Sequence, residues 1–199
     1  MEHNAKGAFM LTKTEIKALI QFTAKPSDRP HLARVAFEPS KKRAYATDGN
    51  TLAVATCLCG YTDDPTPRFT VDRAYLENAV RSCRRKTDSV LIYKSPESET
   101  VRVRVITEDG QPDIVTDVPT EETFPEIDQV IVPKEIPAAS ITEFAIDPNL
   151  LARMKHVSLA TGSIGMRFRA PSDPLDPIRL DMEGESTQWS AIMMPVRLN

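Results

Sequence analysis

Glycine and cysteine are scarce in this sequence, and it has no long apolar run. Its 199 residues include 7 glycines, which argues against a glycine-rich loop of the kind that holds nucleotide phosphates. The 3 cysteines are an odd number in a chain without a recognisable signal peptide, so a framework of disulfides is not expected. No apolar stretch approaches the roughly 18 residues that a membrane-spanning helix requires. We therefore expect a cytoplasmic protein with no membrane partner.

Motifs for catalysis or metal binding are also missing. The sequence contains no Gly-x-Ser-x-Gly elbow, no His-Glu-x-x-His pair and no phosphate loop. Cys57, Cys59 and Cys83 lack the spacing of zinc ligands, and alternate strand positions can equally place small apolar residues in a core. Asp63 and Asp64 are adjacent in a proline-containing loop, without an evident base or metal partner. A hydrolase that uses these aspartates is the weaker alternative, and we expect no enzymatic activity, metal or cofactor.

The composition is typical of a folded protein, but the charge is unevenly distributed. Hydrophobic residues make up 41% and charged residues 27% of the chain. Residues 107–147 hold eleven acidic residues and one basic residue, Lys134, which leaves 17 acidic and 24 basic residues for the rest of the chain. A basic remainder of this kind can bind a polyanion if its charges lie on one face.

The order strand, helix, strands occurs three times along the chain. Thr12 and Glu15 form a capping box before a stretch with helical spacing of apolar residues. Asp72 caps a second helix, and Asp147, followed by Pro148, caps a third. The expected strands are residues 34–37, 43–58 with a turn at 48–50, 68–71, 89–94, 100–107, 113–118, 143–146, 165–170, 177–183 and 189–198.

A proline-rich acidic segment separates the second copy from the third. Each of its prolines disfavours helix at the preceding residue, so this connector at residues 121–142 is expected to be extended. We predict an α+β fold of repeated strand-helix-strand-strand units, with the helices on one face of antiparallel sheets. Residues 1–120 would form one domain of two half-repeats, and residues 143–199 a half domain.

The three predicted helices carry basic and polar residues on their outer faces. One such face is usually no more than a solvated surface. Three of them together favour contacts with the phosphates of a duplex, without base readout, because no aromatic residues are interleaved for stacking on single strands. The candidate DNA-binding residues are Lys13, Lys17, Gln21, Arg73, Arg81, Arg84, Arg85, Arg153, Lys155 and His156.

Three short motifs stand out in the sequence: ATDGNTLA at residues 46–53, FPEIDQV at 124–130 and IMMPVRL at 192–198. The first resembles the ATDGHRLA segment of the bacterial beta sliding clamp, the processivity ring of the replicative polymerase, and the last resembles that family's C-terminal VVMPMRL. Between them, residues 124–130, FPEIDQV, are similar to FPDYRRV, the stretch between the family's second and third domains. Residues 32–38 also resemble the strand that opens the second domain's sheet. The motifs occur in the family's order, and the resemblance covers the chain from about Thr12 to its end.

The resemblance implies the DNA clamp fold, in which helices line the hole of a ring and sheets form its outer wall. Residues 1–120 resemble the family's second domain, and residues 143–199 resemble the C-terminal half of its third. The implied function is a sliding clamp that encircles double-stranded DNA, independently of sequence, and tethers a DNA polymerase or other proteins with clamp-binding motifs. A separate clamp loader would open the ring.

In that family the same motifs build a surface pocket for a short peptide of the partner protein. Asn50, Thr51 and Gln129 stand where the family has histidine, arginine and arginine, so the polar rim of the pocket is expected to differ. The pocket residues that the resemblance implies are Leu32, Thr47, Gly49, Leu52, Pro125, Val130, Met193, Met194, Pro195, Val196 and Arg197.

The number of repeats bears on the assembly. This chain has three half-domain repeats where the bacterial clamp has six, so a dimer would not close the usual ring. Three inward helices per chain would match the family's twelve in a homotetramer, with a homotrimer as the alternative, and either would close through head-to-tail contacts. The alternative function is a clamp-like adaptor that does not encircle DNA and binds or competes for clamp-binding peptides.

Overall fold

The computed structural model describes residues 7–57, 66–85, 88–95, 100–107, 112–118, 124–131, 145–169, 173 and 176–196. Cys59, Asp63, Asp64 and Arg197 lie outside these ranges. The elements, in chain order, are β1 (Phe9–Thr12), α1 (Lys13–Gln21), β2 (Arg34–Glu38), β3 (Arg43–Thr47), β4 (Thr51–Cys57), β5 (Phe69–Asp72), α2 (Arg73–Ser82), β6 (Ser89–Lys94), β7 (Val101–Ile106), β8 (Pro112–Val118), α3 (Pro148–Ala152), α4 (Met154–Thr161), β9 (Arg167–Arg169), β10 (Ile178–Glu183) and β11 (Thr187–Met193).

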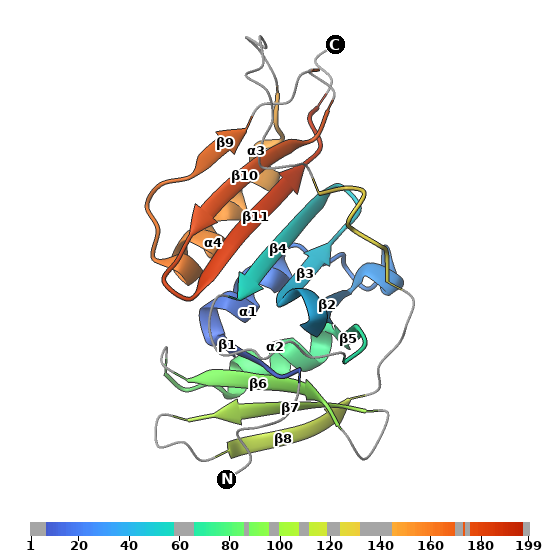
Figure 1. Ribbon diagram of the computed structural model, residues 1–199, viewed down its shortest axis with the longest axis vertical. Coiled ribbons are helices and arrows are strands. Elements are labelled where there is room, and N and C mark those ends of the chain that lie inside the picture. Colours follow the sequence, from blue (N-terminus) through green and yellow to red (C-terminus); the bar gives the residue numbers. More distant parts are fainter. Residues whose placement is uncertain are drawn as a thin grey trace.

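The strands form two antiparallel sheets, which confirms the predicted α+β class. The smaller sheet has the order β1-β6-β7-β8, and the larger has the order β5-β2-β3-β4-β11-β10-β9. The first two repeats exchange their opening strands, because β1 of the first pairs with β6 of the second and β5 of the second pairs with β2 of the first. Figure 1 shows the two sheets one above the other, with β1 and β5 where they meet.

The third repeat extends the sheet of the first. Strand β11 pairs with β4 from Thr187 opposite Cys57 to Met193 opposite Thr51. Helix α1 packs against both α2 and α4, so helices from all three repeats are neighbours. Helices α1 and α4 lie behind the seven-stranded sheet (Figure 1). None of the described helices is long or apolar enough to cross a membrane.

The predicted helix starts are confirmed by their hydrogen bonds. The backbone N–H of Thr12 donates to Glu15 Oε2 at 2.7 Å, and the N–H of Glu15 donates to Thr12 Oγ1 at 3.3 Å, which completes the capping box. The carboxylate of Asp72 accepts the N–H of Ala74, and that of Asp147 accepts the N–H of Asn149. These caps satisfy amides that have no partner within the helix.

The third repeat differs from the prediction in two ways. Its expected opening strand at 143–146 is not present at residues 145–147, which are irregular, and residues 143 and 144 lie outside the described part. In the first two repeats that strand pairs with the other repeat's sheet, and the third has no such counterpart among the described strands. The expected single helix is also interrupted at Arg153. There the N–H of Arg153 donates to the carbonyl of Leu150, three residues earlier, as in a 3₁₀ turn.

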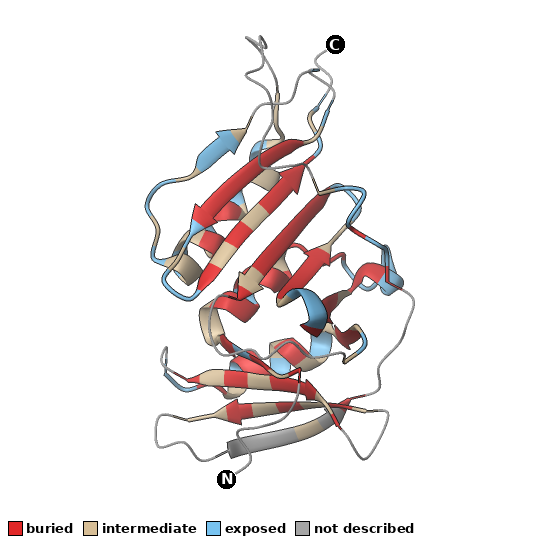
Figure 2. Ribbon diagram, viewed as in Figure 1, coloured by how far each residue is buried: buried red, intermediate tan, exposed pale blue. Residues whose placement is uncertain are grey.

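The central strands β3 and β4 and strand β10 of the larger sheet are buried on both faces, as their almost unbroken red colour in Figure 2 shows, whereas the terminal strand β9 is mostly exposed. Alternate residues face opposite sides, so β3 places Ala44 and Ala46 towards the helices and Tyr45 away from them. The large core lies between the sheets and the helices and contains Trp189, Phe9 and Phe37. A second, smaller cluster lies on the other side and consists of Ala24, Leu32, Ala36, Tyr45, Leu52, Val54, Phe124, Ile127 and Ile192.

Candidate functional site

The turn between β3 and β4 is built around the Asp48 carboxylate. Its Oδ1 accepts the N–H groups of Asn50 at 2.9 Å and Thr51 at 2.8 Å, and the Thr51 hydroxyl lies 3.0 Å away. Gly49 has a φ of +90°, which favours glycine because other residues are strained there. The ATDGNT stretch therefore forms a rigid turn whose tip is exposed.

Two arginines reach this turn from other parts of the chain. Arg153, at the junction of α3 and α4, donates from Nη1 to Asp48 Oδ2 at 2.7 Å and lies 2.8 Å from the Thr51 hydroxyl. Arg29 donates to the backbone carbonyl of Asp48 at 3.0 Å. Burial alone would raise the pKa of the Asp48 carboxyl, but the N–H groups of Asn50 and Thr51 and the Arg153 guanidinium outweigh it and hold the pKa below its usual value.

The end of β11 lies beside the same turn. Leu52 is opposite Ile192, and the N–H of Met194 donates to the carbonyl of Asn50 at 3.2 Å. Beyond the strand, the N–H of Val196 donates to the carbonyl of Ala145. The structure thus brings the first and last of the three sequence motifs together. The middle motif joins them through Phe124 and Ile127, which pack in the same outer cluster as Leu52.

We call the exposed and cluster residues at this meeting point the junction surface. Its base consists of the buried apolar side chains of the smaller cluster on the outer face of the sheet. Large apolar side chains surround the base and stay exposed, with Val130 at 47%, Met194 at 44% and Val196 at 45%. The junction surface consists of Leu32, Thr47, Gly49, Leu52, Pro125, Val130, Ile192, Met194, Pro195 and Val196.

The prediction for Met193 needs correction. Its side chain is fully buried and belongs to the large core on the helix side of the sheet. Residues of β11 alternate between the two faces, so Ile192, which the sequence comparison omitted, takes the place on the outer side. Arg197 lies outside the described residues. Arg29 was also missed, because only the folded chain shows that its guanidinium lies over Gly49, next to Leu32.

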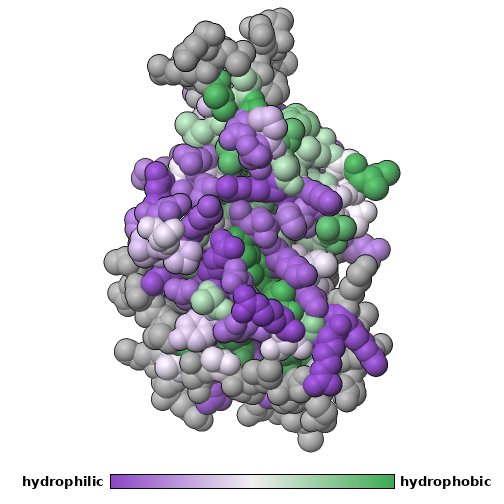
Figure 3. All heavy atoms as spheres, turned by 180° about the vertical axis from the view of Figure 1, so that it is seen from behind, coloured by the Kyte–Doolittle hydropathy of each residue, from purple (hydrophilic) through white to green (hydrophobic). Residues whose placement is uncertain are grey.

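The opposite side of the molecule carries the outer faces of the helices. Figure 3 views the molecule from behind and shows a mostly hydrophilic surface around a narrow hydrophobic strip. Lys17 on α1 and Lys155 on α4 are exposed, and both lie close enough to His156 to affect it. Burial first, and then repulsion from Lys155 and Lys17, lowers the pKa of His156, so this side chain adds little positive charge above pH 7.

The basic residues of α2 have mixed surroundings. Arg73 Nε donates to Glu77 at 2.7 Å, and Arg81 pairs with the same carboxylate at 3.5 Å while remaining 72% exposed. Arg84 and Arg85 follow the helix and are exposed, and the buried Asp88 carboxylate accepts both of their backbone N–H groups. These two hydrogen bonds fix the backbone at Arg84 and Arg85, and the side chains of both residues are exposed.

Two further candidate DNA-binding residues are engaged within the protein. Lys13 Nζ donates to the carbonyl of Cys83 at the end of α2, which suits a cation because carbonyls accumulate negative charge at a helix C-terminus. Arg153 pairs with Asp48, and its half-buried guanidinium lies 6.0 Å from the ring centre of Phe22. The structure thus gives Arg153 an internal partner in place of the free cation that the sequence suggested. Gln21 is half-buried at the end of α1.

Groups that could support catalysis or hold a metal are not concentrated in the described residues. No three histidine, cysteine or acidic side chains come together there. Cys57 and Cys83 are buried, and burial raises the pKa of the Cys83 thiol. The buried Asp181 is held by Arg169 and Arg179, each at 2.8 Å, and by the Ser190 hydroxyl. These neighbours outweigh the effect of burial and lower the pKa of Asp181, so it is not poised as a general acid.

Comparison with known proteins gives matches at the level of structure. No family model matches the chain, and no curated protein does. The DNA polymerase III subunit beta of Pseudomonas aeruginosa has a TM-score of 0.62 and 16% identity, over 100% of this chain and 68% of that one. The subunit beta of Borrelia burgdorferi, in complex with a natural product, has a TM-score of 0.64 and 12% identity, over 100% of this chain and 66% of that one.

A third structure is the beta sliding clamp of C. crescentus, with polyethylene glycol bound at a proposed beta-motif tethering region. It has a TM-score of 0.57 and 15% identity, over 100% of this chain and 68% of that one. This chain therefore spans about two thirds of the length of the chains it matches. At such low identity the likeness establishes the fold alone, and it agrees with the motif resemblance. The chain has the fold of the bacterial DNA polymerase III beta subunits, the sliding clamps.

Proposed function

We propose that this chain is a DNA sliding clamp that encircles duplex DNA as a ring of several copies and tethers partner proteins through the junction surface. One observation carries the proposal: the exposed lysines of α1 and α4 and the apolar, partly exposed junction surface lie on opposite sides of the seven-stranded sheet. A ring needs this division, because one side must meet DNA while the other remains open to partners. The protein itself makes and breaks no covalent bond.

Contacts with DNA would be made by exposed cations on the helix side. Lys17, Arg81, Arg84, Arg85 and Lys155 have the exposure that phosphate contacts require. Such contacts carry no sequence information and weaken as the salt concentration rises, because bound counterions are released from the DNA. Loose contacts of this kind are compatible with sliding, provided that the ring keeps the protein on the duplex.

The outer strands of the two sheets offer a way to close the ring. Strands β8 and β9 are terminal strands of their sheets and lie at opposite ends of the molecule (Figure 1). An exposed strand edge favours pairing with another chain. Head-to-tail pairing of β8 with β9 of the next copy would join the two sheets into one across the interface.

The size of the ring follows from the helices. Helices α1, α2 and the interrupted helix α3–α4 supply three helical segments per chain. Four copies would give the twelve inward helices that the family resemblance implies, so we favour a homotetramer over a homotrimer. A clamp loader would open one of the interfaces between copies.

The junction surface would bind a short segment of a DNA polymerase or another partner. Its exposed Met194 and Val196 can adapt to apolar anchors of a peptide, since methionine side chains conform to varied shapes. Asn50 and Gln129, which are exposed, would give the rim a polarity of its own.

Ring formation is tested by light scattering and by retention on DNA. The native mass should correspond to four chains, or three, and stay constant over a dilution series. Once loaded, the protein should remain on circular plasmid DNA and slide off after the plasmid is cut at one site. A mass of one chain at high concentration, with and without DNA, together with equal retention on both DNA forms, would contradict the ring and support the adaptor that only binds peptides.

A further inference from the structure

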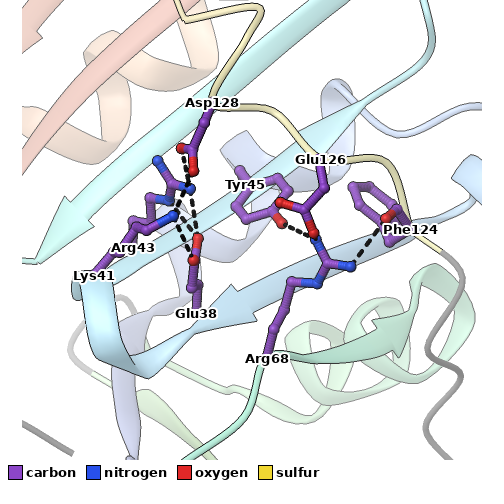
Figure 4. Close-up of polar contacts among 8 residues, drawn as sticks. All are labelled: Glu38, Lys41, Arg43, Tyr45, Arg68, Phe124, Glu126 and Asp128. Carbon is purple, nitrogen blue, oxygen red and sulfur yellow. Dashed lines mark hydrogen bonds and ion pairs between the residues drawn. The ribbon is translucent and has the colours of Figure 1, made fainter. Parts of the chain in front are cut away.

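Residues 124–131 form a short segment that crosses the outer face of the larger sheet, and we call it the strap. Two of its side chains are nearly fully buried, Phe124 at 5% and Ile127 at 2% exposure. Phe124 meets the ring of Tyr45 on β3 edge to face, with 5.6 Å between the ring centres. Figure 4 shows the strap lying over Tyr45, with charged side chains on either side of it. Its apolar side chains therefore attach it to the sheet.

Arg68, just before β5, binds the beginning of the strap. Its Nη1 donates to Glu126 Oε1 at 2.6 Å and to the Tyr45 hydroxyl at 3.1 Å, and its Nη2 donates to the carbonyl of Phe124 at 3.1 Å. The guanidinium thus contacts side chain and backbone at once. An arginine bound in this way fixes the direction of the segment as well as its position.

Arg43 on β3 binds the strap further along. Its Nη2 lies 2.6 Å from Asp128 Oδ1, while its Nε donates to Glu38 at 2.6 Å, so Glu38 orients the guanidinium. Lys41 Nζ contacts the other oxygen of Asp128 at 2.5 Å. The hydrogen bonds of Lys41, then of Arg43, lower the pKa of Asp128, so this carboxylate is ionised at neutral pH. The family segment FPDYRRV has arginine at this position, so the pair of Arg43 and Asp128 depends on this chain's own sequence.

Apolar burial and the ion pairs have different roles in holding the strap. The arginines are largely covered, with side-chain exposures of 22% for Arg68 and 10% for Arg43, whereas Glu126 and Asp128 are exposed at 69% and 50%. Exposed ion pairs add little to folding stability, so Phe124 and Ile127 hold the strap on the sheet. The ion pairs instead select one register among those that the apolar contacts would allow.

That register determines where the junction surface residues of the strap lie. Pro125 is exposed and lies in the chain between the two residues that Arg68 binds, Phe124 and Glu126. Val130 closes a turn in which the N–H groups of Val130 and Ile131 both donate to the carbonyl of Ile127, at 2.9 and 3.0 Å. Since Asp128 is the first residue of that turn, its ion pairs fix the turn against β3, and with it the exposed side chain of Val130.

We propose that Arg43 and Arg68 are positioning residues for partner recognition, because they hold the strap, which carries Pro125 and Val130 of the junction surface, in one register. They act through the strap, because each binds it on the sheet side while the partner would contact Pro125 and Val130. The inference rests on the proposed function, since it assumes that a peptide binds at the junction surface. It adds that partner affinity depends on ion pairs whose arginines the partner does not touch.

The test uses variants on the exposed side of the ion pairs, which leave the buried arginines and the apolar anchors in place. Glu126→Arg combined with Asp128→Arg reverses both strap charges. Glu185→Arg, in the exposed turn between β10 and β11, is the control for an acid-to-arginine change elsewhere. Glu126→Gln combined with Asp128→Asn is the conservative variant, because each amide keeps an oxygen that can accept a hydrogen bond from the arginine.

Two measurements are made on each full-length variant. Hydrogen exchange followed by mass spectrometry reports whether residues 124–131 remain docked. Fluorescence anisotropy reports the affinity for a labelled octapeptide with adjacent leucine and phenylalanine among polar residues, and the same peptide with two alanines is the blank. The double reversal should raise exchange in the strap and weaken the affinity about tenfold, as expected when a contact surface is displaced. The control variant should match the original protein, and the conservative variant should retain most of the protection from exchange and most of the peptide affinity.

The possible failures are distinguishable. Faster exchange in the strap with unchanged peptide affinity would overturn the inference, because the strap would then not be part of the binding surface. Unchanged exchange in the double reversal would overturn the positioning role of the two arginines. If the original protein does not bind the leucine-phenylalanine peptide better than the alanine blank, the peptide-binding part of the proposed function fails, and the inference with it.

Discussion

Asp48 shows how much of this molecule depends on single side chains. Its carboxylate closes the β3–β4 turn within the first repeat and binds Arg153 of the third repeat. One residue therefore sets the local shape of the junction surface and also joins two parts of the chain that are about a hundred positions apart. Such a residue should be sensitive to substitution and to pH.

Replacing Asp48 with asparagine should destabilise the protein by about 1–3 kcal/mol at pH 7, because the half-buried Arg153 loses its charged partner. The pKa of Asp48 is lowered on folding, so its stabilising effect is complete above the unfolded value of about 4 and is lost as the pH falls through the folded value. The difference between the two proteins should therefore shrink below pH 4. The free energy of unfolding of both proteins is measured by urea unfolding, followed by the fluorescence of Trp189, the chain's single tryptophan, which is buried. An equal difference at pH 7 and pH 3 would contradict this role for the carboxylate.

Gly49 and Gly162 provide a matched pair. Both have positive φ, +90° and +70°, so alanine at either position should cost about 1 kcal/mol. A Cβ at Gly162 would meet no atom within 4 Å, whereas one at Gly49 would lie 1.8 Å from the Arg29 guanidinium. Gly49→Ala should therefore be the more destabilising change in urea unfolding, and should also displace Arg29 from the turn. If both variants lose the same free energy of unfolding, Arg29 moves aside at Gly49→Ala without an energetic cost.

At the scale of single residues, the sequence predicts those features that depend on neighbours close in the chain. The capping box of Thr12 and Glu15 involves residues three positions apart, so its pattern is visible in the sequence. The environments of Arg153 and Met193 depend on distant strands and turns, and both were predicted incorrectly from local patterns. Arg29 has no local signal, because it acquires its place next to Gly49 only when the loop before β2 folds back.

Among the elements, the helices and their following loops define the side proposed to face DNA. Helices α2, α1 and α4 are neighbours, with α1 between the other two. Exposed cations on all three leave a basic surface, although Glu77 partly neutralises Arg73 and Arg81. The loop after α2, fixed by Asp88, presents two further arginines.

Reversing Arg81 and Arg84 to glutamate should weaken retention on DNA and flatten its dependence on salt, since two phosphate contacts are lost. Lys25→Glu with Lys94→Glu makes the same change in net charge outside the helices and is the control. Retention is measured as the amount of protein on circular DNA over a range of salt concentrations, with circular dichroism to confirm folding. A salt dependence identical to that of the control would show that α2 does not face DNA.

The boundaries of the elements were predictable where periodicity is strong. The alternation of valine and arginine in β7 and the proline and aspartate before α3 mark their elements clearly. The interruption at Arg153 was not predictable, because the apolar spacing of α3 and α4 continues across it. The strand expected at 143–146 is not seen at residues 145 and 146, the part of it that the structure describes, and in the first two repeats the partner of such a strand comes from the other repeat, which a local pattern does not show.

At the scale of the whole molecule, the terminal strands are β1 and β8 in the smaller sheet and β5 and β9 in the larger, and the proposed ring would use β8 and β9. Phe168, in the middle of β9, is 45% exposed although it is large and apolar. Single exposed apolar residues are common, but one on a terminal strand suits an interface. The proposed head-to-tail ring would cover it.

Replacing Phe168 with glutamate should therefore lower the native mass in light scattering, towards that of a single chain, without unfolding the protein. Met10→Glu, on the outer strand β1 of the other sheet, changes an exposed apolar residue in the same way and should leave the mass unchanged. If both variants keep the mass of the original protein, β9 is not part of the interface.

The order of the strands could not be read from the sequence. Pairing of β4 with β11 joins residues more than a hundred positions apart, and no local pattern specifies such a partner. The position of the junction surface could be predicted only because three motifs resemble a known family. Periodicity alone would have placed Leu52 and Ile192 on strands, without indicating that they are neighbours.

The exchange of β1 and β5 bears on how chains of this kind can originate. Each of the first two repeats supplies a strand that the other's sheet needs, so a duplicated repeat finds a complete partner at once. The third repeat is added at the edge of β4 through β11. Losing either of the first two repeats would remove a strand from both sheets. Gaining or losing a repeat beside β4 would leave the strand exchange between the first two repeats in place. A single gene fusion or deletion at that edge could therefore change the number of repeats without requiring a new fold.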